Sequence, residues 1–147
     1  MATANKNRER VAAILESDTS AIIIDWLDRV ERDGDLTRVP LSKEERTEHL
    51  PKLIWELARR LRVPRKPGTK AAVRHGKARR SQGYSVPMIE KESRILQVCI
   101  FETLQNNLST EDFSLLLTDA MTLDEGIDSQ LKQTLTSFMR QTARIAA

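Results

Sequence analysis

The sequence predicts an all-α protein, a single bundle of six or seven helices, and three observations support this prediction. Apolar residues recur at three- and four-residue intervals along most of the chain, as on one face of a helix. Leu, Ile and Ala dominate these residues, and the chain holds only five glycines. No alternating strand pattern is present. Because 147 residues fit one domain, we expect a single helical domain over residues 1–147.

The first helical pattern lies between residues 11 and 30. Four polar residues at positions 17–20 interrupt it, which leaves one long helix or two helices with a cap near Thr19 as alternatives. The run Asp33-Gly34-Asp35 ends the pattern. The apolar positions of this region are Val11, Ile14, Leu15, Ile22, Trp26, Leu27 and Val30.

The second helical pattern begins with a capping box, in which Ser42 pairs with Glu45. Pro51 falls inside the pattern, and we expect it to kink the helix or to restart it. The stiff segment Val63-Pro64-Arg65-Lys66-Pro67-Gly68 then forms the clearest break in the chain. The apolar face of this helix consists of Leu50, Leu53, Ile54, Leu57, Ala58 and Leu61.

The third pattern predicts a shorter helix over residues 69–82 that ends at Gly83, a favourable residue just beyond a helix C-terminus. We expect Ser85 to cap the next helix and Pro87 to lie in its first turn. The inward stripe of that helix consists of Met88, Ile89, Glu92, Leu96, Cys99 and Thr103.

Two helix starts are expected in the C-terminal part of the chain. Ser109 or Thr110 caps one helix, and Thr122 with Glu125 forms a second capping box inside a segment of otherwise helical spacing. The first of these helices carries Phe113, Leu116 and Leu117, and the last carries Ile127, Leu131, Leu135, Phe138 and Ile145.

Polar side chains occupy the inward face of the 69–82 helix. His75, Arg79 and Gln82 share this face with Ala71 and Ala78, since residues three and four apart lie on the same side of a helix. The two alanines allow a neighbouring helix to approach closely. Buried polar groups are costly unless they satisfy one another or serve a ligand, so this face is a candidate site.

Glu92 lies among apolar residues of the following helix, across the tight link Gly83-Tyr84-Ser85. We expect an Arg79–Glu92 ion pair that fixes how the two helices cross, and a Tyr84 hydroxyl that reaches a backbone group. Two interpretations stay open: a structural lock without a ligand, or a binding or switching site. The candidates for either role are His75, Arg79, Gln82, Gly83, Tyr84 and Glu92.

Charge is distributed unevenly along this chain of net charge +3. No acidic residue lies between Leu57 and Ile89, a region that holds ten of the 24 Lys and Arg residues. Such a block can attract phosphates or acidic partners, or it can be a solvated face neutralised by acidic neighbours, which we favour. The basic patch consists, besides Arg79, of Arg59, Arg60, Arg62, Arg65, Lys66, Lys70, Arg74, Lys77 and Arg80.

Several classes of function are not expected. The spacing of residues shows no metal-ligand cluster, no phosphate-binding glycine loop and no nucleophile–His–carboxylate arrangement, so we expect no enzyme, no metal and no cofactor. A basic nucleic-acid-binding module is an alternative, but neither a recognition motif nor interleaved aromatic residues accompany the basic patch.

Haem or another small ligand in a globin-like pocket is a further alternative, with His75 as axial ligand. The other histidine of the chain, His49, falls in a polar, capped first turn of a helix. Few large apolar residues surround His75. The single cysteine, Cys99, lies in an apolar run and is expected to be a buried, inert thiol. Neither a signal peptide nor a membrane-spanning stretch is found, so we expect a cytoplasmic protein without membrane contact.

The central motif resembles a known domain family. The run His75-Gly76-x-x-Arg79-x-x-Gln82-Gly83-Tyr84-Ser85, followed by Glu92 and Leu96, is similar to the N-terminal sensor domain of RsbRD-type proteins. So are Ile24-x-Trp26-Leu27-x-x-Val30 and His49-Leu50-Pro51-x-Leu53-Ile54-x-x-Leu57-Ala58. The likeness covers roughly residues 12 to 140. Where that family usually has an aromatic residue after the glutamate, this chain has Ser93.

The resemblance implies a function in signal transduction. These domains belong to the RsbT co-antagonists of bacterial stressosomes and also head some sensor histidine kinases. The resemblance therefore implies a cytoplasmic, non-catalytic input domain with a helical fold related to globins that have lost haem. It further implies a homodimer and a C-terminal helix that relays a stimulus to an output domain or partner, which is absent from residues 1–147.

Overall fold

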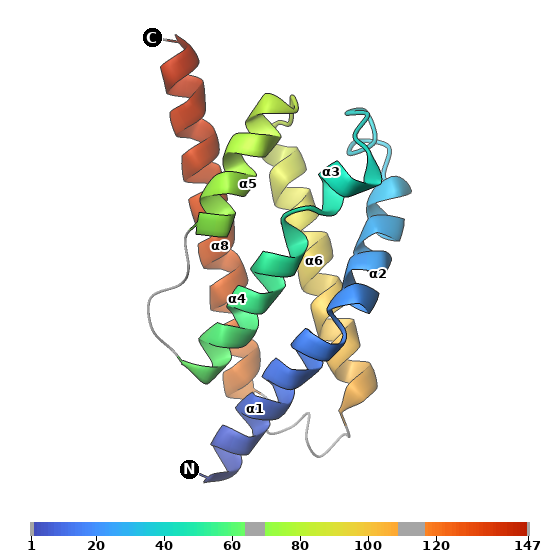
Figure 1. The fold of residues 1–147 in the computed structure, drawn as a ribbon, viewed down its shortest axis with the longest axis vertical. Helices are drawn as coiled ribbons and strands as arrows, with labels where there is room; N and C mark the ends of the chain where they lie inside the picture. Colours follow the sequence, from blue (N-terminus) through green and yellow to red (C-terminus); the bar gives the residue numbers. More distant parts are fainter. Residues whose placement is uncertain (1, 64–69, 109–116, 147) are drawn as a thin grey trace.

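The computed structural model describes residues 2–63, 70–108 and 117–146, and it confirms the all-α prediction (Figure 1). Six helices have 12 or more residues, α3 has five, and no strand occurs in these three ranges. The predicted cap at Ser109 or Thr110 lies outside the described residues, as do Phe113 and Leu116. The helices are α1 (Ala2–Ser17), α2 (Thr19–Glu31), α3 (Lys43–Thr47), α4 (Leu50–Arg62), α5 (Lys70–Ser81), α6 (Val86–Asn107) and α8 (Leu117–Ala146).

The first helical region forms two helices, with the break at Asp18. The Asp18 N–H donates to the carbonyl of Ile14, and the Asp18 carbonyl accepts from the N–H of Ile22. The alternative with two helices is therefore confirmed, and Asp18 is the N-cap residue of α2. No side chain makes the capping hydrogen bond, and the Thr19 hydroxyl donates instead to the carbonyl of Leu15, at 2.7 Å. Helical hydrogen bonds therefore cross the break, and no side chain is needed to cap α2.

The second helical region restarts rather than kinks. Ser42 and Glu45 form the predicted capping box, with both hydrogen bonds at 3.1 Å, but α3 ends after five residues. The next helix, α4, begins at Leu50 with Pro51 in its first turn. A proline lacks an N–H and is tolerated at this position, so the chain begins a new helix there.

The α5–α6 connection is as tight as its sequence predicts. Gly83 has a φ of +86°, which favours glycine because it lacks a Cβ. The N–H groups of Gly83 and Tyr84 donate to the carbonyls of Arg80 and Arg79, which satisfies the end of α5. Ser85 occupies the N-cap position of α6, and Pro87 lies in its first turn.

The last helix, α8, is continuous from Leu117, so the capping box predicted for Thr122 and Glu125 does not start a helix. Residues 117–121, directly before Thr122, contain no proline or glycine, and the segment continues as a helix.

Two glycines allow close contacts with α8. A Cβ on Gly76 of α5 would lie 2.3 Å from the carbonyl oxygen of Thr134, and one on Gly126 would lie 2.8 Å from Leu57.

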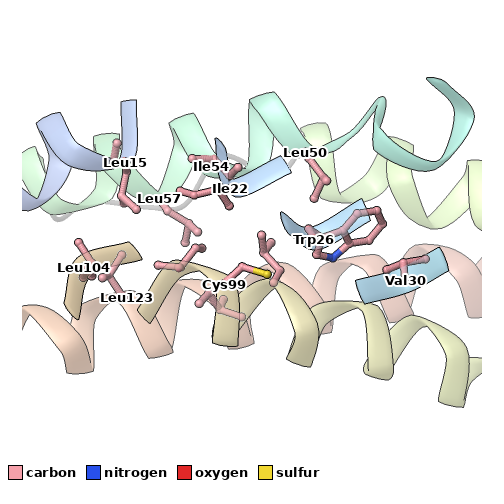
Figure 2. Packing of buried hydrophobic residues seen from close by; sticks show 14 of the residues in the cluster. Leu15, Ile22, Trp26, Val30, Leu50, Ile54, Leu57, Cys99, Leu104 and Leu123 are labelled. Carbon is pink, nitrogen blue, oxygen red and sulfur yellow. The ribbon is translucent and has the colours of Figure 1, made fainter. Parts of the chain in front are cut away.

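The hydrophobic core lies between two layers of helices. Figure 2 shows side chains of α1 and α4 facing those of α6 and α8, with Trp26 and Val30 of α2 at one end. Within the described residues, no helix combines the length and the apolar character needed to cross a membrane. The largest fully buried apolar side chains are Leu15, Ile22, Trp26, Leu36, Leu50, Ile54, Leu57, Leu61, Ile89, Ile100 and Leu123.

Candidate functional site

The site is centred on the predicted ion pair between Arg79 and Glu92. Arg79 Nε lies 3.0 Å from Glu92 Oε1, and Nη2 lies 3.2 Å from Oε2, so the guanidinium binds both carboxylate oxygens. The side chains are only 1% and 3% exposed. The tight turn at Gly83 brings the last turn of α5 beside the start of α6, which gives the pair this geometry.

The remaining Arg79 donors bind α3 and the end of α5. Nη2 donates to the carbonyl of Arg46 at 2.8 Å, and Nη1 donates to Gln82 Oε1 at 2.8 Å and to the Glu45 carbonyl at 3.3 Å. The guanidinium carbon also lies 4.6 Å from the centre of the Tyr84 ring. One buried side chain therefore joins α3, α5 and α6.

Tyr84 differs from its prediction. Its hydroxyl donates to Glu92 Oε2 at 2.8 Å and accepts from Arg46 Nη1 at 3.2 Å, so it contacts side chains and not a backbone group. The reason is that the side chain of Arg46, a residue of α3, is buried in the interior. There it also donates to the carbonyls of Leu36 and Val39. Arg46 was missed from the sequence, although it lies four residues before the apolar position Leu50.

The two histidines lie together, which the sequence did not predict. The His49 and His75 rings are stacked, with centres 3.6 Å apart and planes 8° from parallel. Trp26 packs edge-on against His49, and its indole N–H donates to the backbone carbonyl of Glu92 at 3.1 Å. His49 lies where α3 ends and α4 begins, and it faces the interior cluster, so its assignment to a polar first turn away from His75 was wrong.

Burial sets the protonation states in this cluster. Burial, followed by the nearby Arg79 charge, lowers the pKa of His75 well below 6.5, and burial with the His75 and Arg79 charges does the same for His49. Burial raises the pKa of Glu92, and the charge of Arg79 and the Tyr84 hydroxyl oppose that rise. Both imidazoles are therefore neutral near pH 7, and Glu92 is a carboxylate held by a guanidinium.

A small cavity adjoins these residues. Its volume is about 30 Å³, enough for one or two water-sized groups. Ser93, the residue that replaces an aromatic of the similar family, lies in its wall. The lining residues are Trp26, His49, Leu50, Leu53, His75, Ile89, Glu92, Ser93, Leu96, Ile127, Gln130, Leu131 and Thr134.

The basic patch does not form one uniform surface. Arg62 pairs with Glu9 and Glu16 of α1, and the guanidinium of Arg80 lies 5.3 Å from the Phe138 ring. Arg59, Lys70, Arg74 and Lys77 are exposed, Arg60 is half-buried, and Arg65 and Lys66 lie outside the described residues. Four residues of the patch, Arg59, Arg62, Lys70 and Arg74, line a groove beside the exposed Trp55, which Lys52, Glu16 and Glu56 also line. The groove is therefore mainly basic, with two acidic side chains in it.

Comparison of the chain with protein-family models, with curated proteins and with solved structures gives no match. The similarity to RsbRD-type sensor domains, and the relation to globins that it implies, therefore stay predictions from the motif residues. The site is consequently interpreted from its own geometry.

Proposed function

We propose that this chain is a non-catalytic sensory input domain for signal transduction. The observation that supports it is that Arg79, the centre of the buried cluster, belongs to α5, the helix that packs closely against the long α8. A change in the cluster can therefore reach α8 through a single helix. The residues of the sensor-like motif join this cluster through the ion pair: Tyr84 and His75 lie beside Glu92, and Gln82 accepts from Arg79.

A small stimulus can change which hydrogen bonds form in this cluster, because its groups share their partners. Glu92 is shared by Arg79 and Tyr84, and Arg79 is shared by Glu92, Gln82 and two carbonyls of α3. In a site of low dielectric, adding or moving one charge changes the balance among these partners strongly. A stimulus acts on such a site by binding one arrangement better than another.

The contact between α5 and α8 is close and partly polar. Gly76 lies against the Thr134 backbone, where no side chain would fit. The hydroxyls of Thr134 and Ser137 donate to the carbonyls of Ala72 and Val73, at 3.3 and 2.8 Å. Small residues and specific hydrogen bonds make a stiff interface, so a shift of α5 is transmitted to α8.

The partners in this proposal come from the similarity to RsbRD-type domains. They are a second copy of the chain and an output domain or protein that receives the signal from α8, in the cytoplasm. Figure 1 shows α8 running along the length of the molecule, with its C-terminal end beyond the top of α5.

The two alternatives fit the geometry less well. A cavity of about 30 Å³ beside His75 is far too small for a tetrapyrrole, and His49 is stacked on the face of that ring. For nucleic-acid binding, the basic patch is interrupted by ion pairs with α1 and by two glutamates in its groove.

The proposal is tested by hydrogen exchange on the Glu92→Gln variant. Glutamine keeps the size of the side chain but removes the charge that holds Arg79. We expect amide exchange to become faster in α5 and also in α8 around residues 130–138, although α8 does not contain the substitution.

The matched control is Glu102→Gln, on the same helix. Glu102 also pairs with an arginine, Arg29, but it is 49% exposed and lies away from α5. We expect no change in α8 for this variant. Faster exchange confined to α3 and α6 in Glu92→Gln would show that the cluster is not coupled to α8, and the proposed function would then be wrong.

A further inference from the structure

The stacked histidines have a property that a purely structural role leaves unexplained. Within the described part of the chain, neither imidazole makes a hydrogen bond, although His75 is 7% exposed and each neutral ring carries one N–H and one free lone pair. The imidazole nitrogens are not among the fully buried side-chain atoms that lack a partner, so they retain accessible surface. Both rings line the 30 Å³ cavity, so this cavity is where their partner would lie.

The third group at the cavity is a carboxylate. His75 Nε2 lies 3.9 Å from Glu92 Oε1, and one ligand atom from each of His49, His75 and Glu92 lies within 4.8 Å of the others. Two ligands that are each about 2.1 Å from one ion lie at most about 4.2 Å apart. A contraction of less than about 1 Å would therefore bring all three atoms within coordination distance of one ion. Because each nitrogen lone pair lies in its ring plane, the His75 ring must also turn out of the stack to face the same ion as His49.

We propose that His49, His75 and Glu92 form a binding site for a divalent first-row transition-metal ion such as Zn²⁺. Two imidazoles and one carboxylate suit Zn²⁺, Fe²⁺ or Cu²⁺, whereas Mg²⁺ and Ca²⁺ require mostly oxygen ligands. The cavity has room for the ion and for a water molecule as a further ligand. The ligands come from the start of α4, from α5 and from α6, so no sequence spacing could have indicated this site.

Neighbouring side chains hold Glu92 and His49 in place. Glu92 Oε1 accepts a hydrogen bond from Arg79 Nε and has a second lone pair for an ion, while Oε2 is held by Tyr84. Trp26 packs edge-on against His49 and binds the backbone of Glu92. The positive charge of Arg79 repels the ion, so we expect weaker affinity than in a dedicated structural zinc site.

Because the ion and Arg79 repel each other, binding of the ion should also alter the contacts that Arg79 makes. An ion on Glu92 Oε1 competes with Arg79 for the carboxylate, and Arg79 also holds the carbonyls of α3. Binding therefore weakens the contact among α3, α5 and α6. That the ion is the stimulus of the sensor rests on the proposed function; the metal site itself does not.

The test is calorimetric titration of the metal-free protein with Zn²⁺, and with Mg²⁺ as the control ion. We expect one Zn²⁺ per chain, no uptake of Mg²⁺, and a loss of about 100-fold or more in Zn²⁺ affinity in His49→Phe and in His75→Phe. Phenylalanine keeps the stacked ring and its volume, and circular dichroism verifies that each variant is folded. No Zn²⁺ uptake by the wild type, or equal affinity in the phenylalanine variants, would overturn the proposal.

Two further measurements keep the result decisive if a phenylalanine variant does not fold. Cys99→Ser must bind Zn²⁺ as the wild type does, and X-ray absorption of the zinc complex must show nitrogen and oxygen ligands without sulfur.

Hydrogen exchange of α8 with and without Zn²⁺ separates the metal-site proposal from the sensor proposal. Binding that leaves α8 unchanged supports the site and removes its role as the stimulus. Absence of binding, with a response of α8 to Glu92→Gln, overturns the site and leaves the sensor proposal standing.

Discussion

Arg79 shows, at the scale of a single residue, how a buried charge can be accommodated in an apolar interior. Its guanidinium binds a carboxylate, an amide oxygen and two backbone carbonyls, and lies over an aromatic ring. Removing a charge from water is costly, and this loss is offset only when nearly every donor has a partner. The cluster is therefore sensitive to the loss of either partner of the ion pair.

This sensitivity predicts the effect of breaking the pair. Arg79→Ala and Glu92→Ala should each lower the free energy of unfolding by about 3–5 kcal/mol, because each leaves an unpaired buried charge. The double variant Arg79→Met with Glu92→Leu should lose less than the sum of the two, since the guanidinium of Arg79 and its carboxylate partner are removed together. Urea unfolding monitored by circular dichroism measures these values. Single variants as stable as the wild type would contradict the buried lock.

A second residue, Asp33, predicts a dependence of stability on pH. Its carboxylate accepts from Lys91 and from the N–H groups of Leu36 and Asp35, and these bonds lower its pKa, with Lys91 as the main cause. The folded protein then binds this proton less readily than the unfolded chain. The stabilisation is present above the unfolded pKa of about 3.9 and is lost as the pH falls through the lower folded value.

We therefore expect Asp33→Asn to lower stability by up to about 1 kcal/mol at pH 7, and by almost nothing near pH 2. The matched control is Asp35→Asn, since Asp35 also pairs with Lys91 but its side chain is 62% exposed. Urea unfolding over a range of pH measures both. A loss for Asp33→Asn that is the same at both pH values would show that the charge is not responsible.

At the scale of helices, the ends of elements were predicted best where backbone chemistry decides them. The capping box at Ser42 and the glycine end of α5 are confirmed, because both depend on residues within four positions. The box at Thr122 did not start a helix, because Ser/Thr followed by Glu also occurs inside helices. The packing of the helices against one another depends less on such local motifs than on the small residues at the contacts between helices.

Gly76 provides the test at this scale. In Gly76→Ala, the new Cβ would meet the Thr134 backbone, which cannot move as a flexible side chain can. We expect a loss of about 1–3 kcal/mol despite the better helix propensity of alanine. Gly126→Ala should cost less, since its neighbour is the end of the Leu57 side chain, and Gly34→Ala, with open space around it, should be near neutral. Thermal unfolding measures the three, and equal melting temperatures for Gly76→Ala and Gly34→Ala would contradict the close α5–α8 contact.

At the scale of the molecule, the predicted homodimer needs a surface for a second copy, and α8 carries two exposed apolar side chains. Met121 and Met139 are 59% and 54% exposed, and they are 18 positions apart, which is five helical turns, so both lie on one face of α8. Exposed apolar side chains on a shared face are typical of interaction sites.

Light scattering should therefore give twice the chain mass of 16.8 kDa. Substitution of both methionines by glutamate should yield a monomer, because it replaces the two exposed apolar side chains of this face by charges. The control Ile24→Glu alters an equally exposed apolar residue on α2 and should leave the dimer intact. A wild type that is monomeric at high concentration would contradict the predicted homodimer.

The sequence by itself determined the helices and the Arg79–Glu92 pair, because both follow from spacing within and across one tight turn. Only the tertiary structure shows that His49 and Trp26 lie beside this pair. Trp26 is 66 residues before Glu92 in the sequence, so no local spacing connects the two. Helical periodicity fixes which side of each helix is buried, but not which buried sides meet. The packing of all the helices decides that, and it also decides whether two neutral imidazoles and a carboxylate share one cavity.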